Sequence, residues 1–406
     1  MEEAQLYIKL KEKELQMSFL LHITQAINTN EPAEALFRMY VEYMEYDLDI
    51  EKMLFFVKHE GKWVNVSSSG SVGRDLLTMD DDIIRAYQYM QEIDYETGIF
   101  QGYNLVVPVW HKDQPIALAV IKHTDFDQTR KEFIMTITNI IGVAIENKRL
   151  FKRQLEQERY RKEVELASEV QNMLIPSTLP TTEHIQVASI YKPQLNVGGD
   201  YYDFIKLDNG NYIFCVADIS GKGVGAALLM SNFQATLHAA LEHYTDLKSL
   251  VLYLNRLLVK ITMSERIITL FIADYRPDTS EIYYINAGHT TPFMVMGDEC
   301  HRLVEGCTLL GAFDDIPYIE VGHKMIKDQA LIMAYTDGLT DLLNDDGIYF
   351  DEAYIEKFLF AHGTESAANL NNKLLEQIDT FKGTQDYPDD IAILTCKIME
   401  SHTTKN

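Results

Sequence analysis

The stretch that decides the fold lies in the second half of the chain, where residues 198–229 read GGDYYDFIKLDNGNYIFCVADISGKGVGAALL. Its apolar and aromatic runs predict strands at 202–207 and 211–218, and the residues that follow predict a helix over 225–243. The polar residues between the strands, among them Asp208, are typical of a turn. An aspartate stands at the edge of each strand, Asp200 before the first and Asp218 at the end of the second.

The same alternation continues through the rest of the C-terminal half. Further strand-like runs are interrupted by helical runs over 247–261, 353–361 and 367–380. Strands joined by hairpin-like turns, with long helices inserted between them, are typical of two packed sheets covered by helices. We therefore expect a chain of the α+β class in which residues 181–400 form an αββα β-sandwich.

The N-terminal part predicts a separate module and a helical connection. Helical and strand-like runs alternate over residues 1–148, as expected for helices around an antiparallel sheet. Residues 149–180 follow as a helical, coiled-coil-like linker that ends at Pro176 and Pro180. Its stripe is apolar at both ends and polar in the middle, so a solvated linker helix and a dimerising, signal-transmitting helix both stay open.

Composition excludes several classes of partner. The 406 residues carry a net charge of −25, which repels nucleic-acid phosphates. No apolar run reaches the ~18 residues of a membrane-spanning helix, and the charged N-terminus does not resemble a signal peptide. The four cysteines form no CxxC pair, which favours a reducing, cytoplasmic location. We expect neither a nucleic-acid nor a membrane partner.

Four segments of the C-terminal half place an aspartate at the start or end of a strand. They are GGDYYD with Asp200, VADISGKG with Asp218, YTDG with Asp337, and PDD with Asp389 and Asp390. Crowded carboxylates stay ionised only if cations neutralise them, and hard oxygen ligands favour Mg²⁺ or Mn²⁺ over zinc. Two such ions about 3.5–4 Å apart can activate a shared water for attack on phosphorus. From spacing alone, each aspartate could equally be a turn residue.

That turn interpretation is the one we keep for the other acidic residues near these motifs, which are Asp203, Asp208, Asp345 and Asp346.

The ordered motifs resemble a known family. GGDYYD, ADISGKGVGAAL, NAGH, YTDGLTD and PDDIAIL, between about Glu165 and Ile398, look like the SpoIIE/RsbU-type branch of the metal-dependent serine/threonine phosphatases of the phosphatase 2C superfamily. The preceding EVQNMLIPSTLP is similar to the helix and proline turn that lead into this domain in the family. The resemblance implies hydrolysis of phosphoserine or phosphothreonine on a protein, with two or more Mn²⁺ or Mg²⁺ ions.

The resemblance also implies roles for residues at matching positions. Asp218 would bridge the metals, with the backbone carbonyl of Ile219 as a further ligand. Asp200, Asp337 and Asp389 would complete the set of catalytic metal ligands, with Asp390 as the alternative to Asp389.

Gly199 and Gly221 would supply the tight backbone geometry that the family requires. Asp341 and Ile219 stand where many members have glutamate and valine, and neither change removes a proposed ligand.

Two further residues near the motifs have alternative roles. His289 of NAGH would position a water or a substrate oxygen, or would be a turn histidine with its hydrogen bonds satisfied. Lys222 would touch the phosphate, or would be a solvated loop lysine.

The arrangement of domains predicts regulation and a partner. Residues 1–148 resemble a GAF domain through their helix–strand order and the stretch LVVPVWHKDQPIALAVIKH, which implies either a small-molecule ligand or dimerisation. In the family, a sensor, linker and phosphatase in this order control partner switching, which implies a homodimer acting on a phosphorylated STAS-domain regulatory protein. The alternatives are a catalytically silent phosphoprotein-binding scaffold and a nucleotide cyclase, and the absence of a GxxxxGKS/T run counts against nucleotide binding.

Overall fold

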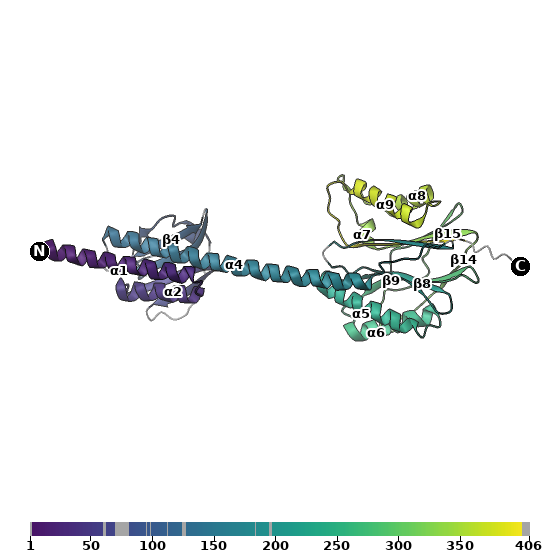
Figure 1. The fold of residues 1–406 in the computed structure, drawn as a ribbon, viewed down its shortest axis with the longest axis horizontal. Coiled ribbons are helices and arrows are strands. Elements are labelled where there is room, and N and C mark those ends of the chain that lie inside the picture. Colours follow the sequence, from purple (N-terminus) through teal and green to yellow (C-terminus); the bar gives the residue numbers. More distant parts are fainter. Residues whose placement is uncertain are drawn as a thin grey trace. The chain divides into compact units, whose positions relative to one another are not determined.

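The computed structural model describes residues 2–59, 62–69, 81–94, 96–97, 99–111, 113–123, 127–182, 184–194 and 197–399 (Figure 1). The chain divides into two compact units, Met1–Arg159 and Tyr160–Asn406. One uninterrupted helix, α4 (Gln128–Leu174), contributes residues to both, so the predicted last helix of the N-terminal module and the predicted linker are a single element. No helix in the described ranges has the length and hydropathy needed to cross a bilayer.

The N-terminal unit is an antiparallel sheet with its long helices on one face and a short helix on the other. The sheet has the order β2-β1-β5-β4-β3, with strands β1 (Lys52–His59), β2 (Lys62–Ser69), β3 (Gln91–Glu92), β4 (Leu105–His111) and β5 (Gln114–Lys122). The helical elements are α1 (Glu2–Asn28), α2 (Ala33–Glu42), the π-helix η1 (Tyr43–Asp47), α3 (Asp81–Arg85) and the first part of α4. Side chains of α1, α2 and α4 pack with Met53 and Phe55 of β1 in one apolar core. This is the predicted α+β arrangement, and the GAF-like assignment stays a prediction.

The C-terminal unit contains two sheets. One has the order β13-β10-β9-β8-β7 with β14 also paired to β10, and the other has the order β12-β11-β15-β16-β6. The strands of the first are β7 (Tyr201–Lys206), β8 (Tyr212–Ile219), β9 (Ile268–Arg276), β10 (Glu281–Ala287), β13 (Gly306–Cys307) and β14 (Gly322–Met325). Those of the second are β6 (Ile185–Lys192), β11 (Phe293–Met296), β12 (Glu299–Arg302), β15 (Gln329–Tyr335) and β16 (Ile391–Met399).

Helices cover the outer face of each sheet in this unit. Figure 1 shows α5 (Val224–Leu241) and α6 (Leu247–Thr262) on one side and α8 (Glu352–His362) and α9 (Ala367–Lys382) on the other. One core joins α5 and α6 to the first sheet and to the inner face of the second, and another lies under α8 and α9. β16 is buried along nearly its whole length, because it runs between these two cores. The predicted αββα sandwich is confirmed.

Local sequence explains where the helices begin. Asp246, Asp351 and Ser366 precede α6, α8 and α9, and each side chain accepts a hydrogen bond from a backbone N–H of the first turn. These caps satisfy donors that a helix start leaves without a partner. They therefore fix the starts of the helices that flank the two sheets.

Candidate metal centre

Two antiparallel strand pairs, one from each sheet, end at the same place. In the first sheet Tyr201 pairs with Ala217, so Asp200 before β7 and Asp218 near the end of β8 lie at one end of the β7–β8 hairpin. In the second, Tyr335 of β15 pairs with Ile393 of β16, and α7 (Asp337–Thr340), α8 and α9 connect the two strands. Asp337, the first residue of α7, and the pair Asp389 and Asp390 before β16 therefore lie at one end of this strand pair.

Hydrogen bonds join these two ends across the sandwich. The Thr336 hydroxyl donates to Oδ2 of Asp200 at 2.6 Å and accepts from the backbone N–H of Ala392 at 2.9 Å. The Asp390 carboxylate accepts from the backbone N–H of Gly199 at 2.8 Å and from that of Gln194 at 2.7 Å. The loop before β7 is thus bound to the loop before β16.

The aspartates raise one another's pKa values. Burial raises the pKa of Asp200 well above its usual value, and the nearby charges of Asp218, Asp390 and Asp337 add to the rise. Burial raises the pKa of Asp218 to about 7, with Asp337, Asp389 and Asp390 contributing and Lys222 opposing. The pKa of Asp337 is raised in the same way, first by burial. Because each ionised carboxylate destabilises its neighbours, a cation bound among them would relieve this repulsion.

Asp389 and Asp390 differ in what they contact. Both oxygens of Asp390 are occupied by backbone N–H groups, and the residue is 8% exposed. The side chain of Asp389 is 38% exposed and pairs with Lys222, with Nζ and Oδ2 3.0 Å apart. Oδ1 of Asp389 accepts from the backbone N–H of Asp390 at 2.8 Å, so both carboxylates have partners, and Asp389 is the more exposed of the two.

The donor set has the chemistry that a hard divalent cation requires. It consists of carboxylates and the backbone carbonyl of Ile219, which lies 2.5 Å from the place that a Cβ on Gly199 would take. A side chain at position 199 would thus collide with that carbonyl. In the arrangement described, no group of three His, Cys, Asp or Glu side chains converges tightly enough to hold an ion. Thr336 and Lys222 contact oxygens of Asp200 and Asp389 in this arrangement.

Position 221 also requires glycine. Its φ is +107°, in the region that favours glycine, and a Cβ there would meet Nη1 of Arg266 at 2.2 Å. Arg266 donates to the backbone carbonyl of Ser220 at 3.1 Å, which holds the loop that follows Asp218.

The two residues with alternative roles are now located. Nδ1 of His289 lies 2.8 Å from the Thr269 hydroxyl, and its backbone N–H donates to Asn286. Burial lowers the pKa of His289 to about 3, so the ring is neutral and belongs to the packed interior. Lys222 is half-exposed beside Asp389, and its Nζ also donates to Oε1 of Gln194 at 2.9 Å.

The structure shows that the interpretation of Asp203 as a turn residue is wrong. Asp203 lies within β7 and is 4% exposed, with its Oδ2 2.6 Å from Nε2 of His238 on α5 and bonded to the Tyr201 hydroxyl. A buried carboxylate needs such partners, and the packing of α5 on the sheet supplies one of them, His238. Asp345 is exposed and accepts hydrogen bonds from Thr384, as expected for a surface turn.

Gln171 near the end of α4 is a residue that the motif reasoning did not single out. Its side chain is buried, and its Nε2 donates to the Gly198 carbonyl at 2.6 Å while its Oε1 accepts from the Gly198 N–H at 3.2 Å. Gly198 stands two residues before Asp200. Its signal in the sequence was its place in the stretch EVQNMLIPSTLP, 27 residues before Gly198.

The part of the chain that carries this cluster is similar to known proteins. Residues 208–399 match the model of the family described as Stage II sporulation protein E (SpoIIE). The chain is 25% identical over 249 residues to phosphoserine phosphatase RsbU of Bacillus subtilis, covering 61% of this chain and 73% of that protein. It is 24% identical over 236 residues to phosphoserine phosphatase RsbP of the same organism, covering 57% of this chain and 56% of that one.

A solved structure shares the fold. The SiaA-PP2C domain of Pseudomonas aeruginosa superposes with a TM-score of 0.54 at 19% identity, covering 61% of this chain and 99% of that domain.

Proposed function

We propose that the C-terminal domain is a SpoIIE/RsbU-type protein serine/threonine phosphatase domain of the phosphatase 2C superfamily, and that it hydrolyses phosphoserine or phosphothreonine on a regulatory protein. The observation that carries the proposal is the meeting of two strand-pair ends, one from each sheet, in a cluster of carboxylates with raised pKa values. The substrate in this proposal is a phosphorylated STAS-domain protein, by analogy with partner-switching systems. The unpaired thiols fit a cytoplasmic reaction.

We propose that Asp200, Asp218, Asp337 and Asp389 hold Mn²⁺ or Mg²⁺, together with the Ile219 carbonyl. When bound, the ions supply the Lewis acidity that makes water nucleophilic near neutral pH and that offsets charge on the phosphoryl oxygens. Asp218 gives up its proton as a cation binds, because its pKa of about 7 reflects burial and repulsion that the cation relieves.

The surrounding residues position these ligands. Thr336 orients Asp200 through its hydroxyl, and Asp390 holds the backbone before Asp200 through the Gly199 N–H. Lys222 compensates the charge of Asp389 at the exposed side of the cluster and is available to a phosphate there once a cation takes its place beside Asp389.

We further propose that the N-terminal unit regulates this site through α4. Support comes from the pair of hydrogen bonds between Gln171 and Gly198, which ties the end of the helix to the backbone that carries Asp200. A dimer formed along α4 would act through the same contact. Equal phosphatase rates and equal metal affinities for the full chain and for a chain starting near Glu165 would contradict this regulation.

The decisive experiment is hydrolysis of p-nitrophenyl phosphate by the full chain with Mn²⁺, compared with Asp218→Asn. We expect turnover that requires the metal and disappears in the variant. No turnover under any metal condition, with tight binding of a phosphoprotein, would instead favour the silent scaffold. Phosphate release from a panel of phosphorylated STAS proteins then tests the proposed substrate class.

A further inference from the structure

The outward face of α6 is basic in a strongly acidic chain. The helix contains Lys248, Arg256 and Lys260 and neither aspartate nor glutamate, whereas the whole chain has a net charge of −25. All three cationic residues are exposed, and among the described residues none forms an ion pair. Their spacing of eight and four residues places them within about 120° of the helix surface, so they share one side. A positively charged face whose cations form no ion pair among the described residues is suited to an anionic partner.

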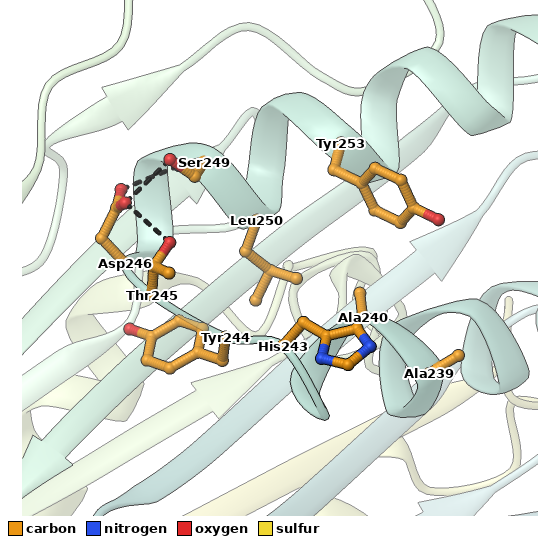
Figure 2. Close-up of a pocket in the computed structure, with 9 residues that line it drawn as sticks. All are labelled: Ala239, Ala240, His243, Tyr244, Thr245, Asp246, Ser249, Leu250 and Tyr253. Atoms are coloured by element: carbon orange, nitrogen blue, oxygen red, sulfur yellow. Dashed lines mark hydrogen bonds between the residues drawn. The ribbon is translucent and has the colours of Figure 1, made fainter.

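A cavity adjoins this face at the start of α6. It has a volume of about 250 Å³ and is lined by the end of α5, the connecting turn and the first part of α6, including His243, Tyr244, Leu250 and Tyr253 (Figure 2). Small-molecule sites usually measure about 300–1,000 Å³. The cavity is therefore of a size to hold one aromatic or aliphatic side chain of a partner protein. Protein interfaces often place an anchor residue in such a pocket, surrounded by polar contacts.

The other end of α6 leads to the loop that follows Asp218. The segment after α6 is tied to the loop after Asp218, since Ser220 accepts from Arg266 through its carbonyl and from the Ile267 N–H through its hydroxyl, the latter at 3.0 Å. The 16 residues of α6 span about 24 Å. A protein whose phosphorylated residue enters the site could thus extend along α6 to the cavity.

We infer that the exposed face of α6, with the cavity at its start, is the docking surface for an acidic phosphoprotein substrate. The inference rests on the proposed phosphatase function and adds the charge of the substrate and the place where it docks. An anionic membrane is a poorer occupant, because the rest of this acidic chain would be repelled by it. A second copy placed about a twofold axis through this face would set the same cations against each other.

The test uses the full chain and three substrates. One is p-nitrophenyl phosphate, and the others are two phosphoserine peptides of about 20 residues, long enough to exceed α6 when extended. The peptides differ only in that glutamates flanking the phosphoserine in the first are glutamines in the second. The variant is Arg256→Glu with Lys260→Glu. The matched control is Lys327→Glu with Lys357→Glu, which changes the charge equally at exposed positions outside α6.

We expect kcat/KM for the acidic peptide to exceed that for the neutral peptide by about tenfold at low salt, through two or more exposed charge pairs. The preference should disappear in the α6 variant, persist in the control and narrow at high salt. All three proteins should hydrolyse p-nitrophenyl phosphate equally. Tyr253→Ala should raise KM for an acidic peptide that carries a leucine anchor, and should leave p-nitrophenyl phosphate turnover unchanged.

Equal behaviour of the α6 variant and the control would overturn the inference. The inference would also be overturned if the α6 variant kept the preference for the acidic peptide but lost binding to phosphatidylserine vesicles. The same holds if it kept that preference while its dimer dissociated. Absence of p-nitrophenyl phosphate turnover in the unmodified chain would be a different result, since it contradicts the phosphatase function itself.

Discussion

Replacing Gln171 with alanine should loosen the proposed metal centre from a position outside it. The side chain is 3% exposed and makes two hydrogen bonds to the backbone of Gly198. Alanine leaves both the Gly198 N–H and its carbonyl buried without these partners. A buried polar group that loses its partner costs about 1–3 kcal/mol. Two such groups, partly relieved by water, should lower the free energy of unfolding by about 2–4 kcal/mol.

The same change should weaken metal binding. Gly198 and Gly199 precede Asp200, and Gly199 is held by Asp390, so freedom at Gly198 spreads to a proposed ligand. Loss of a residue that supports metal ligands typically costs about 10–100-fold in metal affinity or activity. We expect the Mn²⁺ concentration for half-maximal turnover to rise about tenfold, at the lower end of that range, because Gln171 contacts backbone and no ligand directly.

The two units can be followed separately during unfolding. Both tryptophans, Trp63 and Trp110, lie in the N-terminal unit, so their fluorescence follows that unit and the remaining circular-dichroism transition follows the C-terminal one. Gln154→Ala is the matched control, because Gln154 lies on the exposed part of the same helix, and should change stability by less than about 0.5 kcal/mol. If Gln171→Ala behaves like Gln154→Ala in both stability and Mn²⁺ titration, the contact with Gly198 does not support the site.

Three further perturbations have definite expected outcomes. Metal affinity should increase as pH rises through about 7, because Asp218 must lose its proton to bind the metal. Without metal, the C-terminal unit should lose stability as pH rises through the same value, since the pKa of Asp218 in the folded protein lies above the ordinary value of 3.8. A Mn²⁺ affinity that does not change between pH 6 and pH 8 would contradict this. Asp389→Asn should abolish turnover with little change in the free energy of unfolding. Asp390→Ala should lower the free energy of unfolding by about 2–4 kcal/mol, because it removes the acceptor of two backbone N–H groups. The reverse pattern in activity and urea unfolding would exchange the roles of the two residues. The hydrogen bond to Asp203 raises the pKa of His238, so its stabilisation is complete below about pH 6.5 and disappears as pH rises through the raised pKa, a dependence that His238→Gln should remove from urea unfolding curves.

The sequence alone was sufficient to predict the helices and strands and to suggest the candidate metal ligands. Period-two and helical patterns locate β7, β8, α5 and α6 to within a few residues, because burial of one face is written into consecutive residues. Aspartates beside glycine at strand ends suggest a cation site, and the order of motifs indicates the family.

Only the tertiary structure decided what each acidic residue does. Asp203 and Asp390 resemble their neighbours in sequence, yet one is bonded to His238 from α5 and the other to the backbone N–H groups of Gln194 and Gly199, partners that lie far away along the chain. The pKa of Asp218 likewise depends on burial and on the charges of Asp337, Asp389 and Asp390, which flank strands of the other sheet. Local sequence determines which backbone conformation a segment prefers, whereas solvation and charge depend on distances between segments that exist only after the two sheets have packed.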